Sequence, residues 1–310
     1  MMLWLVLALM GAASNAAYYI IIKRYGRHLD PRILTGTSFA MGGCLLLVFS
    51  KIQGFPQTGP DFFPAVAITT ILNIVCLSLI FKVLESSDLS LSAPLLSFTP
   101  VFLICTSFLL LYELPSAAGV TGICIIVGGS YVLNIAGSHN RLRDPVFSMI
   151  KNRSSIIMLL VAFLFSISIN YDKIVITNSD PFFGMALSLI ATGFAFCILA
   201  GSSRISSLIS GQTKPSADTP NEQNGSIHRR SKHSYWWLIP LMAIFIAIEA
   251  ASINIALTLQ IVPYVIAIKR LSIIFMVLYG TIMLAEKEIK PRLVGSTLMF
   301  IGAAVIILCP

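Results

Sequence analysis

Apolar stretches of about 20 residues recur along the whole chain, and short polar stretches separate them. A helix needs about 20 largely apolar residues to cross roughly 30 Å of hydrocarbon. The pattern therefore predicts ten membrane-spanning helices and an all-α, polytopic membrane protein. The predicted spans are 3–23, 32–51, 62–84, 89–111, 115–135, 154–177, 181–203, 235–259, 261–284 and 290–309.

Composition favours the same class of protein. Hydrophobic residues make up 56% of the 310 residues and charged residues only 11%, whereas a soluble domain carries about 25% charged residues. The first apolar run begins without a basic region and continues for about 20 residues. We therefore expect it to be a span and not a cleaved signal peptide.

Lysine and arginine gather in alternate loops of the predicted topology. The stretches 23–32, 141–153, 204–232 and 287–292 hold 16 of the 21 basic residues. The positive-inside rule places such loops in the cytoplasm, so both termini are expected on the other side of a plasma (inner) membrane. Most of the net charge of +8 is thus explained by topology, and no nucleic acid partner is expected.

The same landmarks recur in both halves of the chain at matching spacings. The offset is 150 residues for the first three pairs below and 173 residues for the other three. The pairs are Lys23/Lys173, Pro31/Pro181, Gly43/Gly193, Glu113/Glu286, Gly122/Gly295 and Gly129/Gly302. This repetition predicts two five-helix units.

The first unit spans residues 1–137 and the second spans 154–310. A cytoplasmic linker, 138–153, joins them, and the polar stretch 206–234 is predicted to be a flexible cytoplasmic loop. Because five is an odd number, the second unit enters the membrane in the opposite sense. Inverted repeats of this kind are a recurrent architecture of secondary transporters.

One motif links the chain to a known family. The run LSAPLLSFTPV at 91–101, followed by Tyr112-Glu113, resembles the drug/metabolite transporter superfamily in its ten-span EamA-like branch. A looser echo, YVIAIKRLSIIFMVLYGTIMLAEKE, runs from Tyr264 in the second half. The resemblance implies that spans one to four and six to nine surround a central cavity, which spans five and ten support. It does not indicate a substrate, because this superfamily carries amino acids, sugars, nucleotide sugars, phosphorylated metabolites and toxic compounds.

Three charged residues lie deep inside predicted spans, where a charge costs roughly 2.5–3.5 kcal/mol on insertion scales. Spans eight and nine form a tight hairpin around Gln260, so Glu249 and Lys269 are expected at nearly the same depth. With Arg270 the three groups leave one net positive charge, which suits a carboxylate or phosphate. The alternative is a structural ion pair that fixes helix register.

The Lys269-Arg270 pair also resembles a pair in the ninth span of triose-phosphate translocators, where it binds the substrate's phosphate. Span four of this chain lacks the further lysine that those translocators use. The resemblance therefore leaves a carboxylate monoanion or a zwitterion as open as a phosphate.

A second set of polar residues lies in apolar surroundings and could complete the cavity. Its members are Asn15, Tyr19, Asn73, Asn170, Asn254 and Tyr264. For each the alternative is an interhelical hydrogen bond or an interfacial tyrosine. Asp172 and Lys173 lie near the outer end of span six, where they would form a gating pair or an interfacial salt bridge.

The predicted function is a secondary transporter that moves a small polar, anionic or zwitterionic metabolite by alternating access. Lys269 and Arg270 would bind the anion, and Glu249 would be a counter-charge or a proton-coupling switch. The expected partners are the substrate, the lipid bilayer and a proton or counter-substrate.

Three alternatives remain: a proton-coupled exporter of hydrophobic or cationic compounds, a phosphorylated-metabolite antiporter, and, more remotely, a non-transporting scaffold. No phosphate-binding loop, nucleophile–base cluster or metal-ligand spacing stands in the sequence. The six cysteines are scattered singly through apolar stretches. We therefore expect no enzymatic activity, no cofactor and no metal.

Overall fold

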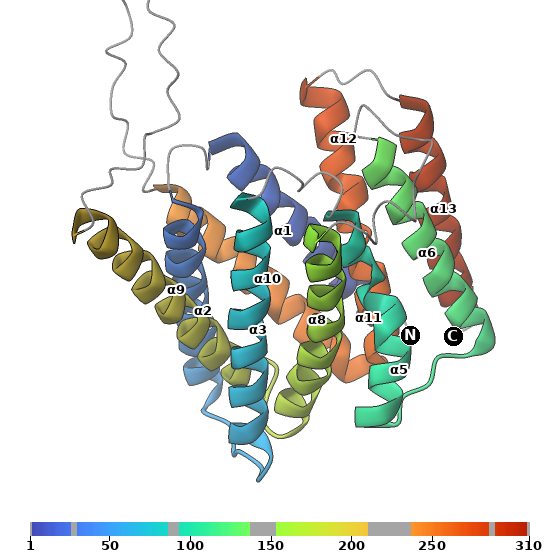
Figure 1. Ribbon diagram of the computed structural model, residues 1–310. Coiled ribbons are helices and arrows are strands. Elements are labelled where there is room, and N and C mark those ends of the chain that lie inside the picture. The colour runs from blue at the N-terminus through green and yellow to red at the C-terminus, as the bar shows by residue number, and fades with distance from the viewer. Residues whose placement is uncertain are drawn as a thin grey trace, which may run out of the picture.

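The computed structural model describes residues 2–25, 30–85, 93–136, 153–209, 237–284 and 289–308. Every secondary-structure element among them is a helix, which confirms the predicted all-α fold (Figure 1). The elements are α1 (Leu3–Tyr25), α2 (Pro31–Gln53), α3 (Phe62–Glu85), η2 (Ala93–Phe98), α5 (Thr99–Leu111), α6 (Ala117–Ala136), α8 (Arg153–Thr177), α9 (Phe183–Ile209), α10 (Leu238–Leu259), α11 (Val262–Lys269), α12 (Ser272–Leu284) and α13 (Ile289–Leu308).

The predicted polar connections between the helices lie largely outside the described residues. The linker 138–153 and most of the loop 206–234 lie outside the described residues. The start of that loop was predicted wrongly, because α9 continues as a helix to Ile209. Glu286 and Cys309 also lie outside the described residues.

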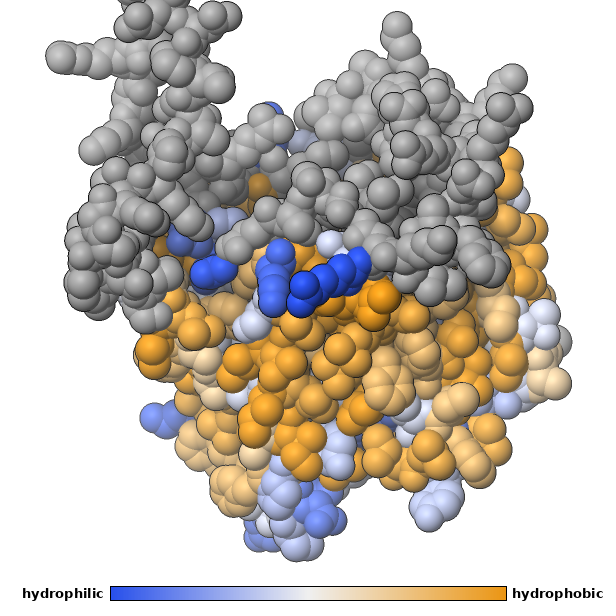
Figure 2. All heavy atoms as spheres, viewed as in Figure 1, coloured by the Kyte–Doolittle hydropathy of each residue, from blue (hydrophilic) through white to orange (hydrophobic). Residues whose placement is uncertain are grey.

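Helix length and surface together show a multi-pass membrane protein. In the described part of the chain, seven helices are long and apolar enough to cross a bilayer. Shorter apolar helices cover Leu95–Leu111, Ala117–Leu133 and Leu293–Leu308, so the count of ten spans stays a prediction. Figure 2 shows a broad apolar band across one face of the molecule. Side chains such as Phe63, Leu109 and Phe300 are more than half exposed and would contact lipid tails.

Two Asp-Pro pairs start equivalent helices. Asp30 caps α2, where its Oδ1 accepts a hydrogen bond of 2.9 Å from the backbone N–H of Arg32. Asp180 does the same for α9, where its Oδ1 accepts hydrogen bonds from the backbone N–H groups of Phe182 and Phe183 at 2.7 and 2.5 Å. Each aspartate satisfies N–H groups that a helix leaves unpaired at its start. The repeated sequence landmark is therefore a repeated helix cap.

Two predicted continuous spans are interrupted in the structure. The span predicted at 89–111 contains the 3₁₀ helix η2 followed by α5, near Pro94 and Pro100. The span predicted at 261–284 is divided between α11 and α12.

At this second interruption the backbone N–H of Leu271 bonds to the carbonyl of Ile268 at 2.9 Å, which is the tighter 3₁₀ pattern. Pro263 does not cause this interruption, because it lies in the first turn of α11, where no N–H is needed. The chain therefore tightens at the two cationic residues and not at the proline.

Glycines bring two pairs of helices into close contact. α2 packs on α9, and α6 packs on α13. A Cβ atom added at Gly193 would lie 2.6 Å from the carbonyl oxygen of Gly36, and one at Gly302 would lie 2.6 Å from that of Gly122. One added at Gly129 would lie 2.7 Å from the carbonyl oxygen of Gly295. Only glycine allows the backbones to approach this closely.

Candidate functional site

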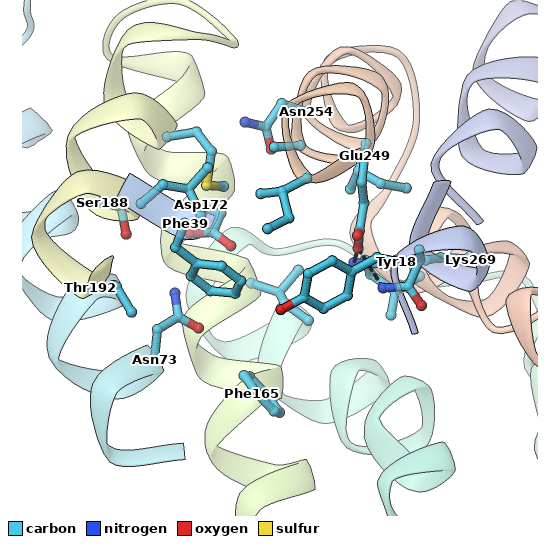
Figure 3. Close-up of a pocket in the computed structure, with 18 of the residues that line it drawn as sticks. Tyr18, Phe39, Asn73, Phe165, Asp172, Ser188, Thr192, Glu249, Asn254 and Lys269 are labelled. Atoms are coloured by element: carbon cyan, nitrogen blue, oxygen red, sulfur yellow. Dashed lines mark hydrogen bonds and ion pairs between the residues drawn. The ribbon is translucent and has the colours of Figure 1, made fainter. Parts of the chain in front are cut away.

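A cavity of about 300 Å³ lies among α1, α2, α3, η2, α8, α9, α10 and the junction of α11 with α12. Its polar lining residues are Asn15, Tyr18, Tyr19, Asn73, Asp172, Ser188, Thr192, Glu249, Asn254, Lys269, Arg270 and Ser272. Figure 3 shows the rings of Phe39 and Tyr18 between these polar groups and the ring of Phe165 below them. A mostly apolar cavity with a few polar groups is the usual form of a small-molecule site.

One edge of the cavity carries an ion pair. The Nζ of Lys269 lies 2.7 Å from the Oε1 of Glu249, as the predicted hairpin around Gln260 requires. The amide of Asn15 donates a hydrogen bond of 2.9 Å to the same oxygen, so α1 helps to hold the pair. The Lys269 side chain is still 30% exposed and that of Glu249 15% exposed. The lysine is therefore balanced in charge but still within reach of a ligand.

Arg270 lies beside this pair without a carboxylate partner in the described part of the chain. Its Nη2 donates a hydrogen bond of 2.8 Å to the Oγ1 of Thr99, at the start of α5. Its Nε is buried and has no hydrogen-bond acceptor among the described residues. A buried donor without a partner is costly. The guanidinium thus holds an unneutralised charge and a vacant donor at the cavity.

Asp172 faces the same cavity from α8, which the sequence analysis did not foresee. The Oγ1 of Thr69 donates a hydrogen bond of 2.5 Å to its Oδ1. Asn73 in turn donates to Thr69 at 3.4 Å. No cation of the described residues lies within ion-pair distance of Asp172, and the expected pairing with its neighbour Lys173 at a gate or interface is wrong. The missed signal is the spacing of Ser168 and Asp172, four residues apart on one helix face.

Lys173 instead forms a clasp with Glu113, Gln260 and Val262. Its Nζ makes an ion pair with the Oε1 of Glu113 and donates a hydrogen bond of 3.0 Å to the backbone carbonyl of Gln260. The Oε2 of Glu113 accepts a hydrogen bond of 2.8 Å from the backbone N–H of Val262. The clasp ties the region after α5, which belongs to the first half, to α8 and α11 of the second half. Glu113, one of the repeated landmarks, thus joins the two halves.

Comparison with known proteins gives one family match, and it lies in the first half of the chain. Residues 2–135 match the sequence model of the EamA-like transporter family. Comparison with curated proteins gives no match. A crystal structure of another protein aligns with a TM-score of 0.70 at 15% identity, over 98% of this chain and 99% of that one. At this identity the likeness shows the fold alone.

Two residues predicted for the site lie elsewhere in the molecule. Asn170 is fully buried and hydrogen-bonds to Ser107 and Thr106 at 2.7 and 3.0 Å, so it joins α8 to α5. The Tyr264 hydroxyl accepts a hydrogen bond of 3.0 Å from the backbone N–H of Ser116, and its ring packs against Gly119. Both are interhelical contacts, the alternative that the sequence left open.

The other seven predicted site residues line the cavity. They are Asn15, Tyr19, Asn73, Asn254, Lys269, Arg270 and Glu249. The amide of Asn254 also donates a hydrogen bond of 2.8 Å to the backbone carbonyl of Pro181, which uses part of its hydrogen-bonding capacity. Their common location makes the cavity the candidate site.

Proposed function

We propose that the whole chain is an EamA-like secondary transporter that carries a small anionic or zwitterionic metabolite through the central cavity. The single observation that carries the proposal is Arg270, which brings an unpaired charge and a vacant Nε–H to the cavity wall. Intramembrane charges that face a cavity usually mark a substrate or ion pathway. Arg270 presents a planar fork that suits a carboxylate or a phosphate.

Alternating access is supported by correspondence between the halves. The offset of 173 residues carries the bounds of α5, Thr99 and Leu111, onto those of α12, Ser272 and Leu284. The glycine contacts also correspond: under that offset the contact of Gly122 with Gly302 maps onto the contact of Gly295 with Gly129. Such reciprocity is expected of two repeats related by a twofold axis. Inverted repeats allow one half to rock against the other around a site at the midplane.

The clasp supports the same mechanism. It holds α8 and the start of α11 together at one end of the bundle. The positive-inside rule places that end away from the cytoplasm, on the side of both termini, in a plasma membrane. Release of the clasp would then open the cavity on the non-cytoplasmic side.

Glu249 has two roles to choose between in this scheme. As a counter-charge it holds Lys269 while the site is empty and releases it to the substrate. In a proton-coupled exporter of hydrophobic or cationic compounds it would instead be the essential acid. The position of Glu249 in the cavity wall supports this second candidate, and its contacts with Lys269 and Asn15 support the first. Replacement by glutamine separates the two roles, since it abolishes transport only in the exporter.

A ligand screen tests the proposal directly. Purified protein in detergent is heated with phosphorylated sugars, organic acids, amino acids and organic cations, because a ligand of the folded state raises its thermal stability. Hits are then measured as labelled solutes taken up by vesicles. We expect anions or zwitterions among the hits, and Arg270→Gln to weaken their binding about 100-fold, or roughly 2.7 kcal/mol.

Arg153→Gln is the matched control, because Arg153 is exposed at the start of α8. Equal effects of the two substitutions would refute the anion site. If no solute of the panel is moved by the wild-type protein, the function as a transporter is refuted with it.

A further inference from the structure

We infer that Asp172 is the binding site for a cationic group, so that the substrate is an elongated zwitterion held between Asp172 and Arg270. The inference rests on the proposed function, since it assigns the anionic end of the substrate to Arg270. It adds the cationic end of the substrate, the residue that binds it and the distance between the two ends. Both side chains line the same cavity.

The carboxylate of Asp172 is built into the cavity wall and has no ion-pair partner among the described residues. Thr69 donates to its Oδ1 and is itself hydrogen-bonded to Ser168 and Asn73. The hydroxyl groups fix the direction of the carboxylate but bring no positive charge to it. Among the described residues, Lys269 is committed to Glu249 and Lys173 to Glu113. A ligand cation would supply the missing charge, and an uncompensated buried charge is strongly destabilising.

Net charge leads to the same ligand class. The charged lining residues are Asp172, Glu249, Lys269 and Arg270, two of each sign. Because Glu249 and Lys269 neutralise each other, one negative and one positive group remain. A simple anion would neutralise only Arg270, and a simple cation would neutralise only Asp172. A zwitterion neutralises both and leaves the loaded cavity without a net charge, which favours movement through a bilayer.

Geometry sets the shape of the ligand. Figure 3 shows Asp172 on one side of the cavity and the Glu249–Lys269 pair, next to which Arg270 follows in sequence, on the other. The rings of Phe39 and Tyr18 lie between them in this view. The ligand therefore carries its ammonium and its carboxylate or phosphate at opposite ends of an apolar middle. Aromatic faces beside the ammonium end would add cation–π attraction.

A series of ω-amino acids tests this assignment. Binding to the purified protein is measured calorimetrically for chains from 4-aminobutanoate to 8-aminooctanoate, for the unsubstituted carboxylates of equal length, and for ω-aminoalkyl phosphates. The wild-type protein is expected to prefer at least one amino compound over its unsubstituted partner by tenfold or more. The two anion series show whether the far end is a carboxylate or a phosphate.

Three variants assign the two ends. Asp172→Asn is expected to reduce the preference for the amino compound to near one, and Asp61→Asn, an exposed aspartate, to leave it unchanged. Asp172→Glu should keep the preference but move the best chain length down by one carbon, which a purely structural carboxylate would not do. Arg270→Gln should weaken both members of every pair equally.

The outcomes separate the two proposals. If unsubstituted anions bind in an Arg270-dependent manner but the amino group adds nothing at any length, the anion site stands and the cation site is refuted. A preference that survives Asp172→Asn refutes it as well. If no anion binds in an Arg270-dependent manner, the proposed function itself fails. Should Asp172→Asn not fold, the wild-type series and Asp172→Glu decide the question.

Discussion

The helix pairs α2·α9 and α6·α13 differ from the cavity in the way the two halves contribute to them. In the helix pairs, glycines from both halves meet reciprocally, and the residues correspond under the repeat offsets. In the cavity, the described lining residues of the first half are all uncharged, and the four charged residues come from the second half. Both halves contribute glycines to the close helix contacts, whereas only the second half contributes charged lining residues to the cavity. Close contacts that correspond between the halves therefore indicate the fold. Charged residues that occur in only one half indicate the candidate site.

The strongest test of this comparison is a bulky substitution in a helix pair. Gly129→Leu is expected to prevent recovery of folded protein, because even a Cβ atom there would lie 2.7 Å from the carbonyl oxygen of Gly295. Overpacking of a tight contact costs about 1–3 kcal/mol, occasionally more. The measurement is the yield of monodisperse protein by size-exclusion chromatography. Gly128→Leu is the control, since nothing lies within 4 Å of its added Cβ; equal loss in both variants would contradict the contact.

A smaller effect is expected from the clasp, whose lysine and glutamate belong to the repeated landmarks. Lys173→Gln removes the ion pair with Glu113, whose side chain is 15% exposed. We expect a loss of about 1–3 kcal/mol in the free energy of unfolding. Affinity for an anionic hit, measured on the folded fraction, should change less than twofold. Lys51→Gln, at an exposed lysine, should change neither quantity.

The Glu249–Lys269 pair belongs to the asymmetric site, so its two members should act in opposite directions. Glu249→Gln leaves two uncompensated cations and is expected to raise affinity for an anionic hit about tenfold, or roughly 1.4 kcal/mol. Lys269→Gln leaves Glu249 beside Arg270 and is expected to lower it by a similar factor. The dissociation constants are measured by calorimetry at fixed salt. A fall in affinity in both variants would indicate a structural ion pair instead.

The smallest expected effect comes from an uncharged residue of the first half that contacts Arg270. Thr99→Val removes the hydroxyl that accepts a hydrogen bond of 2.8 Å from Arg270. A single hydrogen bond contributes about 0.5–1.5 kcal/mol, so anion affinity should fall roughly two- to tenfold. Thr121→Val is the matched control, because Thr121 is exposed and bonds only within its own helix. No difference between the two variants would mean that Thr99 does not position the guanidinium.

The depth of a side chain along its helix could be predicted from the sequence. The side of the helix on which it lies could not. Counting residues from Gln260 placed Glu249 and Lys269 at one level, and the structure confirms their ion pair. Counting residues did not predict which way Asn170, Asp172 and Lys173 point from their common turn of α8. Asn170 faces α5, Asp172 faces the cavity and Lys173 reaches the clasp. Rotation of a helix is set by its neighbours in space, which the order of residues alone does not provide.

Local backbone geometry shows the same division. The aspartate caps at Asp30 and Asp180 follow from short-range hydrogen bonding and could be expected from the Asp-Pro pairs. The interruption at Arg270 has no proline, and its 3₁₀ hydrogen bonds depend on the packing of α11 and α12. Tyr264, likewise, reaches Ser116 across 148 positions of the chain.

Under the proposed function, the vacant Nε of Arg270 affects the rate of the transport cycle. In the empty cavity the Nε–H of Arg270 is buried and unpaired, whereas in the loaded cavity a substrate oxygen accepts its hydrogen bond. Movement of the empty carrier between its two sides is therefore expected to be slower than movement of the loaded carrier. Substrate on the far side of the membrane would then speed efflux from the near side, so the protein should work faster as an exchanger than as a uniporter.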